Sequence, residues 1–383
     1  MAPSSTTTVP PSTTTTSAPA PPGTDGAITR ITDGDDTSML PSVSGDGRYV
    51  AYYSSASNLV PDDTNGVADV FVWDRDTGAT ARITDGNAWS QEPAISVDGR
   101  YVAYYSFASN LVPDDTNGFA DVFVWDRDAG TTTRITDGND NSGRPAVSAD
   151  GRHITFDSSA SNLVPDDANG FKRDVFVWNA DTGTTTRITD SIWYTDEYSL
   201  SGGISADGRY VTFQSLSSTL VPNDTNNHWD VFVWDADTGT TTRISDGGAY
   251  HPRISSDGRY VTYDAIRGTD HVFVWDSTTR TTIRVTDGNG PSGAPTISSD
   301  GRYITFQSWA SDLVPDDTNG VADVFVWDRD TGTTMRITDG DGDSTDAAIS
   351  ADGGSVTFWS AASNLVSDDT NGVRDVFVWN RAT

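Results

Sequence analysis

The chain has 383 residues, no cysteine and a formal net charge of −31. A surface this acidic repels phosphate backbones and anionic lipids, so we expect no nucleic-acid partner. The lack of cysteine excludes disulfides and thiolate metal sites. No apolar run approaches the roughly 18 residues of a membrane span, so we expect no membrane insertion.

Residues 1–26 are rich in Thr, Pro and Ser and cannot build a hydrophobic core. We expect a disordered linker, of the kind found in stalks outside the cell, with a disordered cytoplasmic tail as the alternative. No basic-then-apolar signal peptide starts at Met1, so we expect an export signal or anchor upstream of this sequence. The composition favours an extracellular, periplasmic or other envelope location in a bacterium.

Residues 27–383 repeat one pattern seven times. The motif Ser-x-Asp-Gly-Arg, or a near copy, has its aspartates at Asp46, Asp98, Asp150, Asp207, Asp257, Asp300 and Asp352. Spacings of 43 to 57 residues are typical of propeller blades. The sequence predicts an all-β fold, a seven-bladed β-propeller with four-stranded antiparallel blades.

The second repeat divides into four strands, in which alternating or β-branched residues are separated by tight turns. The predicted strands are Pro93–Ser96, Arg100–Ser106, Asp121–Asp126 and Thr131–Thr136. The seventh repeat has no fourth strand, whereas a spare one, Ala27–Thr32, precedes the first repeat. We therefore expect the N-terminal strand to complete the last blade, because a closed ring has no open sheet edge.

The consensus Ser-x-Asp-Gly-Arg-Tyr-[Val/Ile]-x-[Phe/Tyr], followed by Val-Phe-Val-Trp-Asp and Thr-Thr-Thr-Arg-Ile-Thr, resembles the WD40-like (PD40) repeats of TolB and its bacterial relatives. The resemblance covers about residues 27–380 and implies the propeller fold. It leaves the function open, because propellers host many unrelated functions. The Gly-His signature of true WD40 repeats and the separate N-terminal domain of TolB are absent, so the role of TolB in the cell envelope is not implied.

In such a blade, the first-to-second and third-to-fourth turns lie at one end, the turn end. The second-to-third loops and the crossovers between blades lie at the other, the loop end. The turns of this chain are short and nearly uniform, whereas the loops vary in length and composition. Binding is expected at the loop end, because binding residues concentrate on variable loops.

Six blades carry the acidic insertion Leu-Val-Pro-Asp-Asp-Thr-Asn-Gly-x-x-Asp, or a variant of it, and the fifth blade lacks it. Its Asp-x-Asn-Gly-x-x-Asp spacing resembles part of a calcium loop, so Ca²⁺ is the one cofactor that the sequence suggests. The alternative is that Asp and Asn only cap turns, since Pro61 stands where a calcium loop has its first ligand. The predicted metal ligands are Asp63, Asn65, Asp69, Asp115, Asn117, Asp121, Asp167, Asn169, Asp174, Asp224, Asn226, Asp230, Asp317, Asn319, Asp323, Asp369, Asn371 and Asp375.

Five of the twelve tryptophans lie outside the third strands, and all five fall at the loop end: Trp89, Trp193, Trp229, Trp309 and Trp359. Aromatic rings beside aspartates predict a surface for a protein or a glycan, although single rings can simply pack on the blade ends. The crossover 190–203 is the longest and least repetitive. The predicted ligand-binding residues are Trp89, Trp193, Tyr194, Tyr198, Trp229, Tyr250 and His251.

The sequence has no Gly-x-Ser-x-Gly, no His-Glu-x-x-His and no phosphate loop. From this we predict a monomer that is not an enzyme and that presents an acidic, aromatic face to a protein or glycan. Two alternatives remain. One is a polysaccharide-acting propeller enzyme, a lyase or a hydrolase, with His251, Arg253 and Glu197 as the nearest catalytic cluster. The other is a purely structural surface protein.

Overall fold

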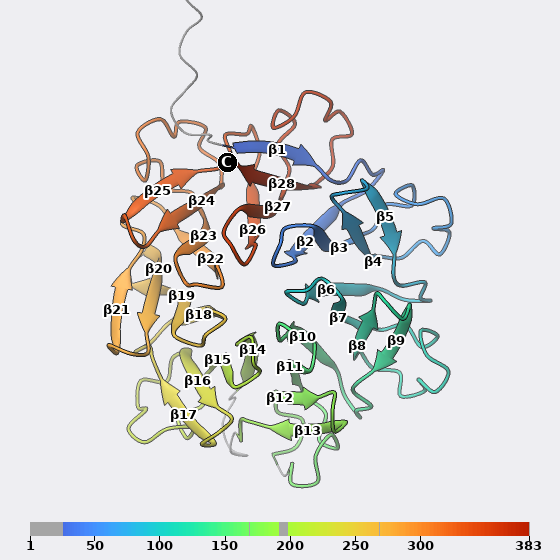
Figure 1. Cartoon of the computed structure of the whole chain (residues 1–383). Coiled ribbons are helices and arrows are strands. Elements are labelled where there is room, and N and C mark those ends of the chain that lie inside the picture. The colour runs from blue at the N-terminus through green and yellow to red at the C-terminus, as the bar shows by residue number, and fades with distance from the viewer. Residues whose placement is uncertain (1–25, 168, 191–197, 268, 383) are drawn as a thin grey trace, which may run out of the picture.

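A computed structural model describes residues 26–167, 169–190, 198–267 and 269–382. Over these residues the chain contains 28 strands and no helix. The strands form seven four-stranded antiparallel sheets, which stand as blades around a central channel (Figure 1). The predicted seven-bladed β-propeller is confirmed. The predicted linker lies outside the described residues, except for Gly26, which begins the first strand.

Each blade runs outward from the channel in sequence order, and only the seventh takes its outer strand from the other end of the chain. Blades 1 to 6 each follow one another along the chain, and their four strands are, from the channel outward: β2 (Ser38–Val43), β3 (Tyr49–Ser54), β4 (Asp69–Asp74) and β5 (Ala79–Arg82); β6 (Ser90–Ile95), β7 (Tyr101–Ser106), β8 (Asp121–Asp126) and β9 (Thr131–Arg134); β10 (Ser142–Val147), β11 (His153–Ser158), β12 (Asp174–Asn179) and β13 (Thr184–Arg187); β14 (Ser199–Ile204), β15 (Tyr210–Ser215), β16 (Asp230–Asp235) and β17 (Thr240–Arg243); β18 (Ala249–Ile254), β19 (Tyr260–Arg267), β20 (Thr269–Asp276) and β21 (Thr281–Arg284); β22 (Ser292–Ile297), β23 (Tyr303–Ser308), β24 (Asp323–Asp328) and β25 (Thr333–Arg336).

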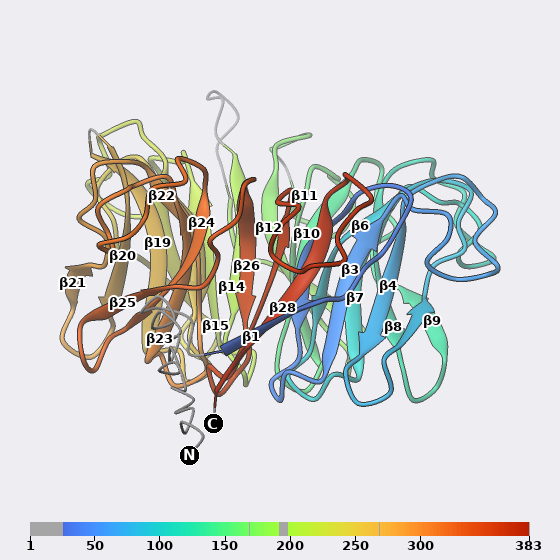
Figure 2. The same ribbon diagram turned by 90° about the horizontal axis from the view of Figure 1, so that it is seen from above.

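Blade 7 closes the ring as predicted. It consists of β26 (Ser344–Ile349), β27 (Ser355–Ser360), β28 (Asp375–Arg381) and the N-terminal strand β1 (Gly26–Arg30). β1 pairs with β28 antiparallel, from Gly26 opposite Arg381 to Arg30 opposite Phe377. The two chain ends therefore meet at the turn end of the disc (Figure 2).

The core lies between blades. Alternation in the third strand turns valines to one face and aromatic residues to the other, and the valine face of one blade packs on the aromatic face of the next. Val70 and Val72 of blade 1 thus join Tyr104 and Phe123 of blade 2 in one buried cluster. This stack repeats around the ring and holds the seven inner strands at fixed positions.

At the turn end, the repeated motif is structural. Ser96 donates a hydrogen bond to Asp98, whose carboxylate also accepts the backbone N–H of Arg100. The Arg100 guanidinium in turn makes two hydrogen bonds, of 2.9 and 2.7 Å, to Asp126 at the end of the third strand. The Trp-Asp pair of the repeat therefore serves to tie the second and third strands together, which leaves the loop end for function.

Candidate functional site at the channel mouth

The inner strands carry an irregularity near the loop end, where the pairing with the second strand shifts, as between Gln91 and Ala94. The third residue of six inner strands takes a left-handed backbone conformation without being glycine. These residues and their φ angles are Leu40 (49°), Glu92 (51°), Arg144 (50°), His251 (51°), Ala294 (49°) and Asp346 (50°). Such a conformation costs about 1 kcal/mol for a residue with a Cβ, and strain of this kind gathers at functional sites.

These third residues form the mouth ring, which consists of Leu40, Glu92, Arg144, Ser201, His251, Ala294 and Asp346. All seven line one cavity of about 630 Å³ in the central channel. The mouth ring differs in every blade, whereas the neighbouring positions of the repeat hardly change. A chemically varied ring in a nearly uniform repeat is the feature that we take as the candidate site.

Behind the mouth ring, one residue of each second strand forms a second varied ring: Tyr53, Tyr105, Asp157, Gln214, Asp264, Gln307 and Trp359. Each of them pairs with the residue that precedes a mouth-ring member, as Tyr105 does with Gln91 and Asp157 with Gly143. The second ring therefore supports the mouth ring and orients its side chains.

Blade 3 holds a buried charge network. Asp157 is fully buried, and its carboxylate lies 2.9 Å from Nε of Arg173 and 3.6 Å from Arg144. The backbone N–H of Ser201 donates to the same carboxylate at 3.1 Å. Burial raises the pKa of Asp157 to about 6, while the two arginines oppose this rise. The network fixes Arg144 at the edge of the channel.

Blade 5 places a histidine and a carboxylate together. Nδ1 of His251 lies 2.8 Å from Oδ1 of Asp264, and its backbone N–H donates to Oε1 of Gln214 in blade 4. The His251 side chain is 60% exposed, whereas that of Asp264 is 9% exposed. An exposed imidazole held by a buried carboxylate is suited to hydrogen bonding with a ligand and to proton transfer.

Blades 7 and 1 hold an acidic and aromatic group. The indole N–H of Trp359 donates to Oδ2 of Asp346 at 2.6 Å, and the Arg374 guanidinium covers the Trp359 ring at 4.7 Å. Tyr53 lies nearby in blade 1. Burial raises the pKa of its phenol, and the negative charges of Glu92 and Asp346 add to that rise.

Arg253 and Glu92 complete the lining of the channel. Arg253 belongs to a ring further inside the channel, whose other members are small: Ser42, Ala94, Ala146, Gly203, Thr296 and Ala348. Solvent reaches Arg253 through the channel, yet protein surrounds it, and this desolvation lowers its pKa. Burial also raises the pKa of Glu92, against the positive charges of Arg144, Arg173 and Arg253.

The predicted aromatic residues fall into separate groups. The ring centroids of Trp229 and Tyr250 lie 6.2 Å apart, and those of Tyr250 and His251 lie 6.3 Å apart, so this trio reaches the channel mouth. Trp89 is 54% exposed and packs on Phe107. The ring of Tyr198 lies beneath the ammonium of Lys172. Trp193, Tyr194 and Glu197 lie outside the described residues.

In each of the six acidic loops, the predicted metal ligands surround an arginine of the outer strand. In blade 1, Nη1 of Arg82 lies 3.0 Å from Asp63 and 3.3 Å from Asp69, and Asn65 donates to Asp69 at 2.7 Å. The arginines of the other five loops pair in the same way with the first and last aspartates of their loops: Arg134 with Asp115 and Asp121, Arg187 with Asp167 and Asp174, Arg243 with Asp224 and Asp230, Arg336 with Asp317 and Asp323, and Arg30 with Asp369 and Asp375.

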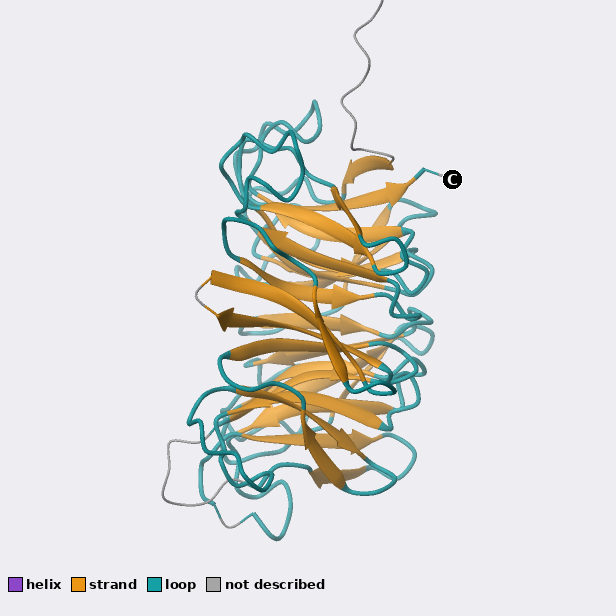
Figure 3. Cartoon of the chain, turned by 90° about the vertical axis from the view of Figure 1, so that its left-hand side faces the viewer, coloured by secondary structure: helices purple, strands orange, loops and turns teal. Residues whose placement is uncertain are grey.

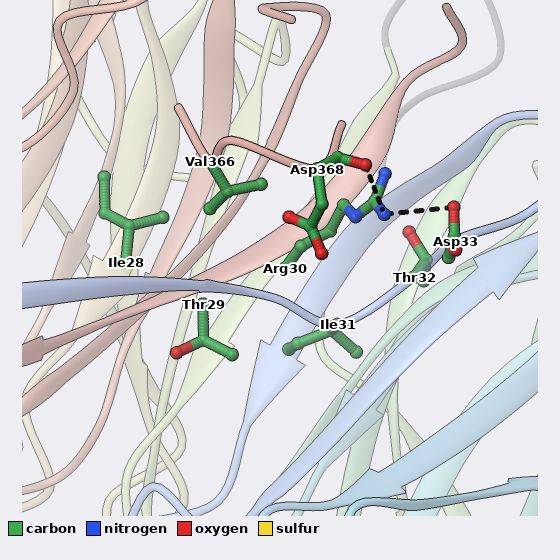
Figure 4. Close-up of a pocket in the computed structure, with 8 residues that line it drawn as sticks. All are labelled: Ile28, Thr29, Arg30, Ile31, Thr32, Asp33, Val366 and Asp368. Carbon is green, nitrogen blue, oxygen red and sulfur yellow. Dashed lines mark hydrogen bonds and ion pairs between the residues drawn. The ribbon is translucent and has the colours of Figure 1, made fainter. Parts of the chain in front are cut away.

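The asparagines Asn117, Asn169, Asn226, Asn319 and Asn371 repeat the bond of Asn65 to the last aspartate. Figure 4 shows the seventh loop, where Arg30 bonds the backbone oxygen of Asp368 and pairs with Asp33. Within the described residues, no group of three or more His, Asp or Glu side chains has the arrangement of a metal site. Calcium binding stays a prediction, and an ion there would compete with arginine for the same carboxylates.

The sequence singled out His251 and Arg253 but missed Glu92, Arg144, Asp157, Arg173 and Asp346. One signal was present. Most arginines stand at positions that recur in every blade, and six do not: Arg144, Arg173, Arg253, Arg267, Arg280 and Arg374. Arg144 and Arg253 line the channel, and Arg173 and Arg374 contact residues of the second ring. Residues that break a repeat are therefore the ones to examine for function.

Comparison with known proteins supports the fold. No family model and no curated protein matches the chain. Among solved structures, oligogalacturonate lyase from Vibrio parahaemolyticus is similar with a TM-score of 0.62 at 13% identity, over 92% of this chain and 93% of that one. The β-propeller domain of the Trilobed protease from Pyrococcus furiosus gives 0.61 at 14% identity, over 92% and 97%. TolB from Acinetobacter baumannii gives 0.49 at 17% identity, over 79% and 67%.

These similarities correct one prediction. The chain was predicted not to be an enzyme because familiar catalytic motifs are absent, yet enzymes such as the oligogalacturonate lyase share its propeller fold. That prediction was wrong as an inference, because missing motifs do not separate binding propellers from catalytic ones on this scaffold. In the described part of the chain, no helix is long and apolar enough to cross a membrane.

Proposed function

We propose that this chain is a propeller that binds a protein segment or a glycan at the loop-end mouth of its central channel. The observation that carries the proposal is the mouth ring, where seven different side chains converge on one cavity of about 630 Å³. A cavity of this size, with a few convergent polar groups, suits a small ligand or the end of a larger one. The repeat consensus supports a WD40-like (PD40) family, and with it a place outside the bacterial cell or in its envelope.

A second candidate is a polysaccharide-acting enzyme, a lyase or a hydrolase. The contact between His251 and Asp264, with Arg253 in the same cavity, supplies a group able to move a proton beside a positive charge. Both candidates use the same mouth. Release of unsaturated or reducing sugar ends from acidic and neutral polysaccharides, in wild type but not in His251→Gln, would favour the enzyme.

The location of the binding site is tested by filling the channel. Ala146 lies in the small inner ring, and Ala146→Trp should abolish binding on glycan and peptide arrays. Thr131→Trp, on the exposed outer strand β9, is the matched control and should bind as the wild type does. Equal binding by all three proteins would show that the ligand site lies elsewhere on the propeller.

A further inference from the structure

The charges of the channel mouth are divided between two sides. Glu92 of blade 2 and Asp346 of blade 7 stand on either side of blade 1, whereas Arg144, His251 and Arg253 come from blades 3 and 5. Figure 1 shows the inner strands of blades 7, 1 and 2 (β26, β2 and β6) side by side, and those of blades 3 to 5 (β10, β14 and β18) next to them around the ring. The channel mouth therefore has an acidic side and a basic side.

Most of these charges already have a side-chain partner. Arg144 contacts Asp157, His251 contacts Asp264, and Asp346 accepts from Trp359. Two do not. Within the described residues, the Glu92 carboxylate makes no hydrogen bond or ion pair, and the only hydrogen bond of Arg253 is to the carbonyl oxygen of its neighbour Pro252, at 3.0 Å.

Glu92 and Arg253 interact at a distance without touching. Glu92 exerts the largest charge effect on the pKa of Arg253, and Arg253 likewise acts on Glu92, yet they form no ion pair. Blades 2 and 5 stand across the channel from each other (Figure 1), and the cavity lies between their inner strands. The gap between the two groups is thus part of the cavity.

Two desolvated charges without partners are costly unless something pairs with them. A simple anion at Arg253 would be repelled by Glu92 and Asp346, and a simple cation at Glu92 would be repelled by Arg253 and Arg144. A molecule with both charges, oriented along the channel mouth, satisfies both groups.

The acidic side also carries aromatic rings suited to an ammonium group. Tyr53 and Tyr105 both respond to the charge of Glu92, and the face of a phenol ring attracts a cation. The phenol of Tyr105 donates to Gln91, which holds the ring in place. The Trp359 ring is already covered by Arg374.

We propose that the channel mouth binds a zwitterion, the free ammonium and carboxylate groups of an amino acid or short peptide, with the ammonium at Glu92 and the carboxylate at Arg253. The proposal rests on the function proposed above and names the class of ligand for that site. It explains why the two groups without partners have opposite charge and lie in one cavity.

The test uses glycine, diglycine, triglycine and tetraglycine, titrated into the full chain by calorimetry. The series varies the distance between the two charges, so we expect one length to bind best. N-acetylation or C-terminal amidation of that peptide should each weaken binding about tenfold or more, because each leaves one buried charge without a partner. These capped peptides need no variant, so the result does not depend on how a substitution folds.

Variants then assign each end of the peptide. Glu92→Gln should weaken the free peptide about as much as acetylation does, and should leave the affinity of the acetylated peptide unchanged. Arg253→Gln should stand in the same relation to amidation. Arg280→Gln, at an exposed position of the opposite, turn end, is the matched control and should change nothing.

Two results would overturn the inference. Capped and free peptides binding equally well, with loss of both in Ala146→Trp, would reject the zwitterion and keep the channel mouth as a binding site. No binding by any free peptide, together with array ligands that Ala146→Trp still binds, would reject both the zwitterion and the proposed function.

Discussion

The third residue of each inner strand is where the repeat departs from uniformity. Its left-handed conformation belongs to the bulge, which the pairing of every inner strand shares. Glycine would suit that backbone best, yet six blades place other residues there. Because the backbone is set by the bulge, the side chain can vary from blade to blade without altering the fold.

Substitution by glycine tests this strain directly. Ala294, at φ 49°, has only a Cβ to lose, so we expect Ala294→Gly to be neutral or to stabilise the fold by up to about 1 kcal/mol. Ala94 of β6 has no positive φ, and Ala94→Gly should lower the free energy of unfolding by about 0.5–1 kcal/mol. Denaturant unfolding of both variants measures the difference, and an equal loss in the two would contradict the argument.

A second residue-scale prediction concerns the arginine inside each acidic loop. The Arg82 side chain is 10% exposed, and its partners Asp63 and Asp69 are 3% and 0% exposed. Arg82→Ala leaves two buried carboxylates without a cation, so we expect it to cost about 3 kcal/mol or more. The exposed Arg280→Ala should cost almost nothing, and adding Asp63→Asn to Arg82→Ala should restore part of the loss. Thermal unfolding of the three variants supplies the comparison.

The same variant tests the calcium hypothesis. If the loop carboxylates bind Ca²⁺, the ion must compete with Arg82 in the wild type and meets no arginine in Arg82→Ala. Calcium should therefore raise the melting temperature of Arg82→Ala more than that of the wild type. Magnesium at equal ionic strength is the control, and equal shifts with both ions would mean that the loops are capped turns only.

At the scale of elements, the N-terminal strand is what closes the molecule. β1 makes the outer edge of blade 7, and just beyond it Thr32 donates to the buried Asp375. Deleting residues 1–24 should leave the melting temperature unchanged. Deleting residues 1–33 should lower it sharply and promote aggregation, because an open sheet edge is then exposed. Equal melting temperatures for the two truncations would show that β1 is not needed for closure.

The elements show which parts of the fold the sequence predicts. Turn glycines such as Gly99, at φ 69°, and alternating strands locate the blades and their order, because these signals are local. The start of each inner strand was missed: β6 begins at Ser90, not at Pro93. The bulge that precedes the proline depends on a left-handed residue that is not glycine, and no local pattern reveals such a residue.

The candidate site was harder to predict for a related reason. Glu92, Arg144 and Asp346 stand in different blades, and only the closed ring brings them to one channel. His251 was found because histidine is rare in this chain. The arginines of the acidic loops were taken as structural without their partners, since each comes from the outer strand that follows its loop.

At the scale of the whole molecule, the aspartates form two populations with opposite pKa shifts. At the turn end, the hydrogen bonds from Arg48 lower the pKa of Asp74 to about 2, and Asp126 shifts the same way. At the loop end, burial raises the pKa of Asp121, Asp174 and Asp323 to about 6. Each of these buried carboxylates shares one arginine with a second aspartate, which favours uptake of a proton by the pair.

These shifts predict how stability depends on pH. A carboxyl whose pKa is raised by folding binds its proton more tightly in the folded state, so its contribution is complete below about pH 4 and is lost as pH rises through about 6. The lowered group, represented by Asp74, contributes above about pH 4 and loses that contribution as pH falls toward 2. Protonation also reduces the self-repulsion of a chain with a net charge of −31. We therefore expect the melting temperature to rise by several degrees from pH 7 to about pH 4.5 and to fall again below pH 3. Scanning calorimetry at constant ionic strength measures this profile. Asp121→Asn, which is neutral at every pH, should flatten the rise between pH 4.5 and 7, whereas Asp62→Asn, on the surface of an acidic loop, should not. A melting temperature that falls steadily from pH 7 to pH 4 would mean that the paired arginines, rather than burial, control the loop-end carboxylates.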